Sequence, residues 1–447
     1  MPQVVRRSFL WVYLFLSCWS HGSAAEQANA TNPPAVPPSP TSGPVLTLED
    51  AKRMAFERNW DLLAAKSDVD FAVAQRIVAH EFPNPTLNMS SQKINVDRGS
   101  GTELGNGLWD RSYDTIAAIN QLFEIGGKRA SRQASAKASL EAAQARFQDA
   151  RRVLDLAVTK NYIAALVAEE NVRILRQSAA SLRQEATIAA TRLQAGDISR
   201  ADKAQIDITA DRLELDASTA ETAAAAARIA VEVLLAVSNP KGNWAPGDSL
   251  DKLASLPFTR QEGSPGAFRP DLFAAEAVAR KAEADLRLQK AMRIPDPTLM
   301  LMYEHEPPDA INTIGLGVAF PLPLWNRNRG AIQAAAAQRE QSALAVQKLK
   351  AQIAAEINTA SLSYADAAAR LRRQRDEIQP KSAEITKTIS FAYQKGGASL
   401  LDLLIAERND NDIRLATAQA MADAANAAAA LKAAMGPPEP PRSPSRP

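Results

Sequence analysis

The stretch DLLAA at residues 61–65 decides the fold, because it returns as DLFAA at residues 271–275. Two further segments return at a similar interval: NPTL at 84–87 as DPTL at 296–299, and GDISRAD at 196–202 as GGASLLD at 396–402. A repeat of roughly 200 residues is too long for a short-period solenoid and indicates a duplicated domain. The two halves are therefore predicted to be two copies of one structural unit.

Composition excludes several classes of protein. The 447 residues carry 52 basic and 50 acidic side chains, which give a net charge of +2 and no basic surface for nucleic acid. The single cysteine, Cys18, excludes a disulfide within the chain and a multi-thiolate metal site. The sequence has no glycine-rich phosphate loop or Ser/His/Asp arrangement, and only 3 histidines. We predict that the protein is not an enzyme and binds no cofactor.

The N-terminus is typical of an exported protein. Two arginines precede an apolar stretch at residues 9–17, and Ser23–Ala25 supplies the small residues of a cleavage site, so residues 1–25 are a predicted signal peptide. Cys18 leaves lipid attachment open as an alternative. No run of about 18 apolar residues follows, so no membrane-spanning helix is predicted.

Proline content marks the ends of the remaining chain. Residues 26–45 are a predicted extended, proline-rich tether, and residues 437–447 a similar disordered tail. Between them, repeat 1 is placed at 46–245 and repeat 2 at 246–436. Helices are predicted at 47–80, 127–193, 199–237, 268–294, 330–393 and 399–435, and strands at 86–94, 113–124, 298–305 and 312–321, with a loop at 97–110.

Both long helices carry a sustained seven-residue repeat. In the first, one series consists of Leu140, Phe147, Leu154, Ala168, Leu175 and Leu182, interrupted by Asn161; the other consists of Val158, Ala165, Val172, Ala179, Ala186 and Leu193. Such a repeat is typical of a left-handed coiled coil, and a helix of this length would extend over roughly 100 Å. The second long helix has the series Ile357, Tyr364, Leu371, Ile378 and Ile385, and Pro380 is expected to bend it.

The predicted strands alternate between apolar and other residues. One face holds Leu299, Leu301 and Tyr303 in one strand, and Ile314, Leu316, Val318 and Phe320 in the next. Strands of about 9 to 11 residues with one apolar face suit the wall of an outer-membrane barrel; a soluble hairpin packed on helices is the alternative. Four strands cannot close a barrel, and open sheet edges do not occur in lipid, so a membrane location would require several copies to pool their strands.

In this order the motifs resemble those of the TolC-type outer-membrane factors of tripartite efflux pumps. Each half carries Asp-Leu-x-Ala-Ala, then Pro-Thr-Leu at the start of a strand, a glycine-marked entry to a long helix, and a Gly-x-x-Ser-x-x-Asp turn. The resemblance extends from about Leu46 to Met435. The segment FPLPLWNRNRG at 320–330 is similar to the heavy-metal efflux branch of that family.

The resemblance implies a mainly α-helical, internally duplicated fold with a small β part. Each protomer of a homotrimer would give four strands to a twelve-stranded transmembrane β-barrel and its coiled-coil helices to a periplasmic α-helical barrel. The protein would be a passive exit duct in the outer membrane of a Gram-negative bacterium, extending into the periplasm. Its cargo would be divalent heavy-metal ions, with organic compounds as the alternative.

The implied partners are a periplasmic membrane-fusion adaptor, an inner-membrane pump of the RND type and outer-membrane lipid, with no nucleic acid. The competing interpretation is that the chain is itself a periplasmic coiled-coil adaptor or scaffold. Such an adaptor would show one helical hairpin between two halves of a lipoyl-like β domain. This sequence shows two hairpins, each after its own strand pair.

Two equivalent turns are the candidate functional site. Gly196 and Gly396 end the long helices, and Ser199 and Ser399 begin the return helices. Aspartate three residues after each serine predicts an acidic form of the capping box, which by itself explains both pairs. The resemblance adds a second role, because in the family these turns form the periplasmic aperture.

By resemblance, Asp202 matches an acidic residue that bonds across helices to a tyrosine, which Tyr393 matches. Asp402 matches an acidic residue that faces the pore, so three copies would form an anionic ring that attracts cations. The family has a second latch between an arginine and a threonine, but this sequence has Ala398 and Ala201 there. That link is therefore expected to be missing.

No resident metal site is predicted, even for a metal cargo. His80 and His305 lie in separate halves, and Met300 and Met302 alternate with leucines in a strand, which is more typical of packing than of soft-metal binding. After the last strand, the segment Trp325–Arg329 is compatible with contact to lipid headgroups and equally with a solvated turn.

Overall fold

The computed structural model describes residues 43–92, 114–255, 266–306 and 310–437. The predicted signal peptide, Cys18, most of the predicted tether, the loop predicted at 97–110 and the tail after Pro437 lie outside the described residues. All described residues belong to one unit, Ser42–Pro447.

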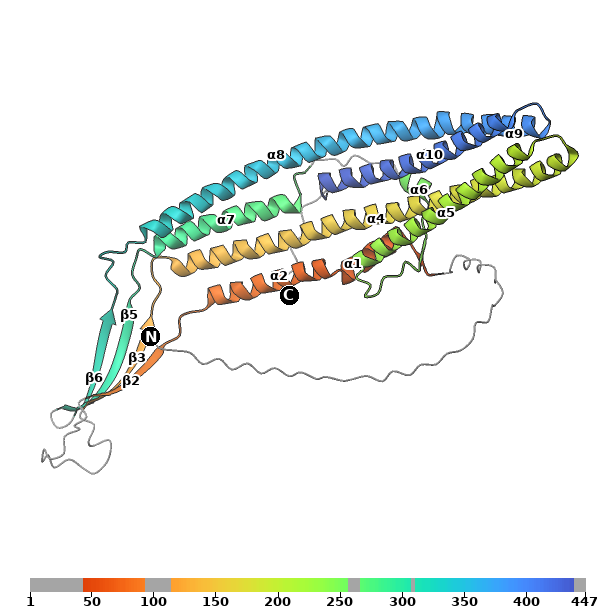
Figure 1. The fold of residues 1–447 in the computed structure, drawn as a ribbon. Helices are drawn as coiled ribbons and strands as arrows, with labels where there is room; N and C mark the ends of the chain where they lie inside the picture. Colours follow the sequence, from red (N-terminus) through yellow and green to blue (C-terminus); the bar gives the residue numbers. More distant parts are fainter. Residues whose placement is uncertain (1–42, 93–113, 256–265, 307–309, 438–447) are drawn as a thin grey trace, which may run out of the picture. The chain divides into compact units, whose positions relative to one another are not determined.

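The same order of elements occurs twice along the described chain (Figure 1). The first half contains α1 (Leu48–Arg58), α2 (Trp60–His80), β2 (Thr86–Gln92), β3 (Asp114–Leu122), α4 (Lys128–Ala195) and α5 (Arg200–Leu234). The second half contains α7 (Pro270–Ala291), β5 (Thr298–Glu306), β6 (Ala310–Ala319), α8 (Arg329–Arg373), α9 (Gln379–Gln394) and α10 (Leu400–Met435). The fold is mainly helical with a small sheet, as predicted. No helix in the described ranges is both long and apolar enough to cross a membrane.

Helix α4 is 68 residues long, and its packing explains its length. Both predicted heptad series are largely buried: Leu140, Leu154, Leu175 and Leu182 of the first, and Val158, Ala165, Val172, Ala179 and Ala186 of the second, in which most side chains are small. Because of these small side chains, α4 packs closely against α2, α5, α7 and α10. The predicted coiled-coil helix is confirmed, and at 1.5 Å per residue it is roughly 100 Å long.

The second long helix is interrupted where the sequence predicted a bend. Helix α8 ends at Arg373, a π-helical turn follows at Gln374–Ile378, and Pro380 lies in the first turn of α9. Proline lacks the amide hydrogen that an α-helix uses, and its ring displaces a carbonyl one turn earlier, which the wider π turn accommodates. The heptad of this helix is only partly buried within one chain, because Leu371 is 6% exposed but Ile385 is 55% exposed.

The helix predicted at 47–80 is instead two helices that meet at Asn59, so that part of the prediction was wrong. The Asn59 side chain accepts a hydrogen bond from the Leu62 amide at 3.1 Å, which caps α2. It also donates to the Leu234 carbonyl at 3.0 Å, at the C-terminal end of α5. Helix α2 therefore begins where the return helix α5 ends, and the Asn59 side chain supplies a partner for an unpaired backbone group of each helix.

The second half forms the same junction with different chemistry. Arg269 precedes α7, is 3% exposed, and donates to the Ala434 carbonyl of α10 at 3.3 Å. It also forms ion pairs with Asp271 and Glu356, each at 2.5 Å. A buried guanidinium requires such partners, because an unpaired buried charge is strongly destabilising.

A core beside these junctions surrounds Tyr162 of α4. Its ring is fully buried and stacks on Trp244, with ring centroids 6.0 Å apart. Its hydroxyl donates to the Leu46 carbonyl at 2.9 Å. Leu46 belongs to β1 (Val45–Leu46), which pairs in parallel with β4 (Ala245–Pro246), and α6 (Leu250–Ala254) follows. Val45, the last residue of the predicted tether, is thus part of a strand.

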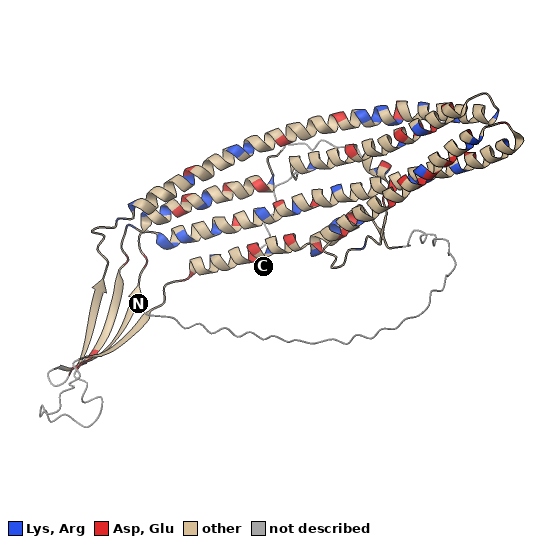
Figure 2. Cartoon of the chain, viewed as in Figure 1, with Lys and Arg blue, Asp and Glu red and all other residues tan. Residues whose placement is uncertain are grey.

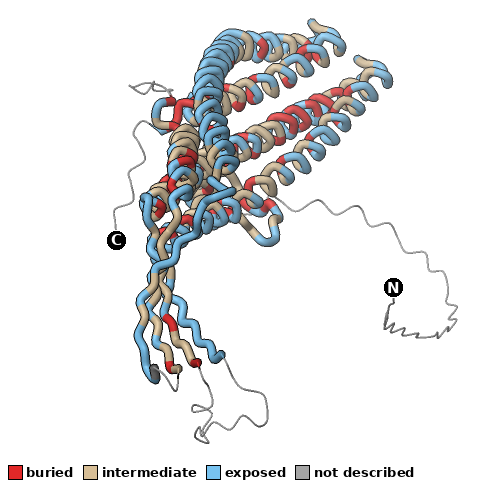
Figure 3. Tube along the Cα trace, turned by 90° about the vertical axis from the view of Figure 1, so that its left-hand side faces the viewer, coloured by how far each residue is buried: buried red, intermediate tan, exposed pale blue. Residues whose placement is uncertain are grey.

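The four longer strands form one antiparallel sheet in the order β2-β3-β5-β6. Strands β3 and β5 join the two halves, with Ile119 opposite Leu301, and Leu301 is in turn opposite Leu316. The predicted alternation is confirmed, since the exposed apolar face of the sheet includes Leu299, Leu301, Tyr303, Ile314, Leu316 and Val318. Figure 2 shows that charged residues are spread along the helices but are scarce on the strands, and most of the sheet is exposed or half-buried (Figure 3).

The opposite face of the sheet packs methionine against glycine. Met300 lies opposite Gly317 and Met302 opposite Gly315. A β-carbon on Gly315 would come within 2.7 Å of the Met302 methyl group, and one on Gly317 within 2.8 Å of the Met300 methyl group. These methionines therefore fill space above glycines, as the packing interpretation predicted.

Replacing Asn59 with alanine is expected to lower the free energy of unfolding by about 1–2 kcal/mol, because α2 loses its cap and α5 loses a partner for its terminal carbonyl. Thermal unfolding followed by circular dichroism measures this effect. Ser67→Ala on the exposed side of α2 is the control, since the Ser67 hydroxyl donates to the Leu63 carbonyl of its own helix. Equal melting temperatures for the two variants would contradict the assigned role of Asn59.

Alkaline pH is expected to weaken the Tyr162 core. Burial raises the pKa of Tyr162 to about 12, whereas a tyrosine in the unfolded chain titrates near pH ~10. Between these values the unfolded chain loses a proton that the folded chain keeps, so stability falls as pH rises from about 10 to 12. Tyr162→Phe should flatten the dependence of melting temperature on pH over this range, and an unchanged slope would exclude Tyr162 as its source.

Candidate functional site at the hairpin ends

Both helical hairpins turn through a glycine in the left-handed conformation. Gly196 has φ 83° and ends α4, where the Asp197 amide donates to the Arg192 carbonyl at 2.9 Å. Gly396 has φ 79° and follows α9, where its amide donates to the Tyr393 carbonyl at 3.0 Å. A residue with a β-carbon is strained in this conformation, which explains glycine at both positions.

The return helices begin with complete capping boxes, in the predicted acidic form. The Asp202 amide donates to the Ser199 hydroxyl at 3.1 Å, and the Asp202 carboxylate accepts from the Ser199 amide at 3.1 Å. Asp402 and Ser399 make the same pair of bonds at 3.2 Å and 3.1 Å. The bonds from Ser399 lower the pKa of Asp402, so this exposed carboxylate is ionised at neutral pH.

Side chains also connect the two hairpins near these turns. Arg192 of α4 donates to the Tyr393 carbonyl of α9 at 3.2 Å, and its guanidinium lies 5.0 Å from the centre of the Tyr393 ring. Glu185 of α4 is 8% exposed and accepts from Gln394 at 3.0 Å and from Ser390 at 3.3 Å. The first hairpin therefore holds the second through one cation and one carboxylate.

Tyr393 is 3% exposed, and its hydroxyl has no hydrogen-bond partner within the described part of the chain. Burial raises the pKa of Tyr393; Arg192 opposes this shift, while the carboxylates of Glu185 and Asp202 add to it. Asp202 thus lies close enough to act on Tyr393 electrostatically. The hydrogen bond between them that the resemblance implies is not formed, because the tyrosine hydroxyl is unpaired and the Asp202 carboxylate bonds to Ser199 instead.

A groove of about 820 Å³ runs between α5 and α10, with α4 at its floor. Its polar lining includes Asp202, Glu407 and Asp412. Burial raises the pKa of Glu407, and the neighbouring carboxylates of Asp410 and Glu185 add to the shift while Arg414 opposes it. The groove is therefore rich in carboxylates, and Asp402 at the second turn is exposed to solvent.

Sequence reasoning identified the turns but missed Arg192 and Glu185. Arg192 lies in the last turn of α4, where a basic residue is usually explained by the helix dipole. Its partner lies 201 positions away in the chain, in the other hairpin. Only the packing of one hairpin against the other reveals the pair.

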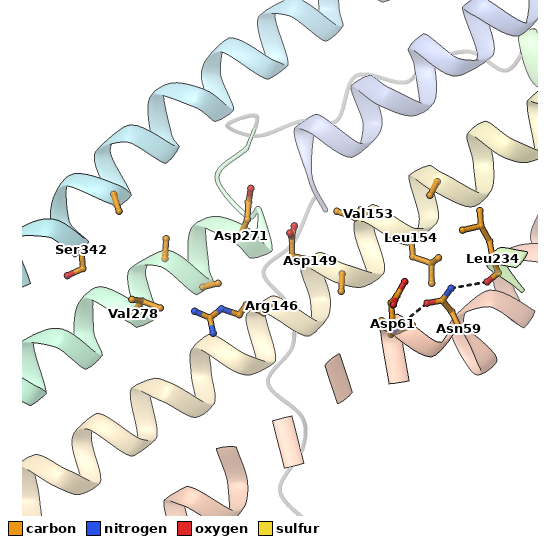
Figure 4. A pocket seen from close by; sticks show the side chains of 16 residues that line it. Asn59, Asp61, Arg146, Asp149, Val153, Leu154, Leu234, Asp271, Val278 and Ser342 are labelled. Atoms are coloured by element: carbon orange, nitrogen blue, oxygen red, sulfur yellow. Dashed lines mark hydrogen bonds between the residues drawn. The ribbon is translucent and has the colours of Figure 1, made fainter. Parts of the chain in front are cut away.

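A second hollow, of about 660 Å³, lies where the two copies of the repeated motif meet (Figure 4). Asp61 and Asp271 occupy the first turns of α2 and α7 at its rim, and Arg146 and Asp149 of α4 line it. Most of the remaining lining is alanine, valine and leucine. The repeated Asp-Leu-x-Ala-Ala motif thus marks the start of each short helix, beside the junctions at Asn59 and Arg269.

Within the described ranges, no group of three or more histidine, cysteine, aspartate or glutamate side chains could hold a metal ion. The segment after β6 is solvent-exposed, and Trp325 is 92% exposed. Arg327 and Arg329 lie in the same exposed segment.

Strands of this length with one exposed apolar face are typical of proteins whose strands form a barrel in the outer membrane. The family model "Outer membrane efflux protein" matches residues 52–237 and 267–437, and the chain belongs to this family. It is therefore an outer-membrane efflux channel and not an enzyme or a periplasmic adaptor, which confirms the class and location predicted from the sequence.

Known proteins share both sequence and fold with the chain. The cobalt-zinc-cadmium resistance protein CzcC of Cupriavidus metallidurans is 26% identical over 405 residues, which are 90% of this chain and 93% of that protein. The crystal structure of CusC has a similar fold, with a TM-score of 0.72 and 16% identity over 89% of this chain and 93% of CusC. The open-state MtrE channel of Neisseria gonorrhoeae is similar as well, with a TM-score of 0.70 and 19% identity over 87% of this chain and 88% of MtrE.

Proposed function

We propose that three copies of this chain close into an efflux duct, with a twelve-stranded barrel in the outer membrane and a helical barrel in the periplasm. The observation that carries the proposal is that both lateral edges of the unit are unpartnered. In the described sheet, β2 and β6 are the edge strands, each paired on one side only. Open edges are not tolerated in lipid, so β6 of one copy must pair with β2 of the next.

The helices beside these strands support the same arrangement. Helix α2 packs on α4, and α8 packs on α7, so α2 and α8 lie on opposite sides of the layer. Both expose large apolar side chains, including Phe71 at 66% and Ile77 at 60% on α2, and Leu344 at 58% and Leu362 at 74% on α8. Such patches mark an interaction surface, and a head-to-tail contact that repeats around an axis closes into a ring. The number three follows from the family resemblance.

Divalent heavy-metal ions are the proposed cargo, supported by the name of the relative CzcC, a cobalt-zinc-cadmium resistance protein. A periplasmic membrane-fusion adaptor and an inner-membrane pump of the RND type would deliver them. Three copies of Asp402 would place an anionic ring at the hairpin ends, which attracts cations without holding them tightly.

The hairpin ends are the proposed periplasmic aperture, with a Tyr393–Asp202 latch. The support is that the buried Tyr393 hydroxyl has no hydrogen-bond partner among the described residues, while Asp202 acts on it electrostatically. An unsatisfied buried hydroxyl is costly, so a small movement that gives it a carboxylate acceptor is favourable.

At the other end of the helices, Trp325 and the two arginines after it are the proposed contact with lipid headgroups.

Leu362→Asp is expected to disrupt the trimer, because it adds a charge to an apolar contact between copies. Size-exclusion chromatography with light scattering, in detergent, measures the mass of the assembly. Ser363→Asp, an exposed neighbour on the same helix, is the control for the added charge. A wild-type protein that is monomeric in detergent would contradict the proposed assembly.

Deletion of the gene is expected to make the host hypersensitive to zinc, cobalt and cadmium salts, and a plasmid copy should restore resistance. The screen should include copper, silver and organic toxicants. Hypersensitivity confined to organic compounds would exclude the proposed metal cargo but would leave the duct itself intact.

Either Tyr393→Phe or Asp202→Ala is expected to raise single-channel conductance in planar bilayers, because each removes one partner of the latch. Channels formed by the wild-type protein are the reference. Unchanged conductance in both variants would refute the latch.

A further inference from the structure

We propose that Arg192 is a positioning residue of the aperture, which fastens the second hairpin to the first by holding Tyr393 at two points. The inference rests on the proposed aperture at the hairpin ends. Neither the capping boxes nor the Tyr393–Asp202 latch requires it, because Arg192 belongs to a different helix from Asp202 and contacts the carbonyl and the ring of Tyr393.

The first point of contact is the Tyr393 carbonyl. This oxygen accepts the Gly396 amide at 3.0 Å, which forms the second hairpin turn, and the Arg192 guanidinium at 3.2 Å. Carbonyls at the end of a helix carry partial negative charge and lack partners within the helix. Arg192 thus satisfies an end carbonyl of α9 from a different helix.

The second point of contact is the ring. The guanidinium lies 5.0 Å from the ring centre of Tyr393, within the range of a cation–π interaction. Tyr393 is 3% exposed, so this contact is largely shielded from water, which strengthens it. The carboxylates of Glu185 and Asp202 act electrostatically on the same tyrosine.

Arg192 also belongs to the first turn, because its own carbonyl accepts the Asp197 amide at 2.9 Å. One residue therefore joins the backbone of both hairpin turns. The other arginines of this stretch of α4 act differently: Arg176 pairs with Glu221 at 2.6 Å and Arg183 with Glu214 at 2.6 Å, both on α5 of the same hairpin.

The sequence around the turns explains why such a residue is needed. At the positions where the family resemblance implies an arginine–threonine latch, the chain has Ala398 and Ala201, whose side chains cannot form hydrogen bonds. Arg192 supplies a cationic link between the hairpins from a different helix. We infer that it takes over the restraint that the alanines lack.

The test is the open fraction of single channels in planar bilayers. Arg192→Ala should raise the open fraction about fivefold, which corresponds to the loss of one partly shielded cation–π contact. Arg192→Lys should give an intermediate value, because lysine keeps the charge but not the planar fork. Arg183→Ala is the matched control and should behave as wild type, since its partners lie within one hairpin.

A double-mutant cycle separates positioning from simple helix stabilisation. If Arg192 acts through the Tyr393 ring, then Arg192→Ala should have a smaller effect in the Tyr393→Leu background than in the wild type, because leucine keeps only the carbonyl contact, whereas independent effects add. Full additivity would mean that Arg192 only stabilises the end of its own helix, and would overturn the inference. Melting temperature and trimer mass, measured on each variant, establish that it is folded.

Failure of this inference can be distinguished from failure of the proposed function. Wild-type-like gating of Arg192→Ala, together with altered gating of Tyr393→Phe or Asp202→Ala, would overturn the role of Arg192 and leave the aperture standing. Absence of conductance in wild-type channels would overturn the duct, and the inference with it.

Discussion

The unpaired edges of the unit are the constraint on which the rest of the structure depends. A sheet of four strands has two edges, and in lipid each edge must find a partner. The helical layer also has two borders, α2 and α8, that expose apolar side chains. Helix α4 contacts neighbouring helices on several sides, and its many buried alanines let these helices approach closely.

Both halves of the duplicated chain form the same junction between two shorter helices. In each half, the C-terminal end of the return helix, α5 or α10, meets the N-terminal end of the helix that precedes the strands, α2 or α7. The first half uses a neutral side chain, Asn59, which bonds to both ends. The second half uses a charged one, Arg269, with Asp271 as its partner. The repeated Asp-Leu-x-Ala-Ala motif lies beside both junctions, since it follows Asn59 in the first half and Arg269 in the second.

Local patterns in the sequence predicted most of the fold. The heptads of α4 and the alternation in β5 and β6 follow from contacts that recur at short, regular intervals, and a proline always removes one helical donor. The break at Asn59 was missed because the residues around it continue a helical pattern. Asn59 caps α2 through the nearby Leu62 amide, but its second bond goes to the Leu234 carbonyl, far along the chain. Sequence reasoning missed Arg192 for the same reason, because its contact with Tyr393 forms only when the two hairpins pack together. The capping role of Asp202 and Asp402, by contrast, involves serines three residues away and could be predicted from the sequence alone.

The methionines above Gly315 and Gly317 have a consequence for the width of the passage. In a closed barrel, the apolar face of the sheet is turned to lipid, so these thioether side chains point inward. Each glycine leaves room beneath a methionine that even one methyl group would fill. Alanine at either position would push the methionine toward the axis, and the same displacement would occur in every copy around the ring. In the proposed trimer, the bore at this level would thus depend on two missing β-carbons per chain.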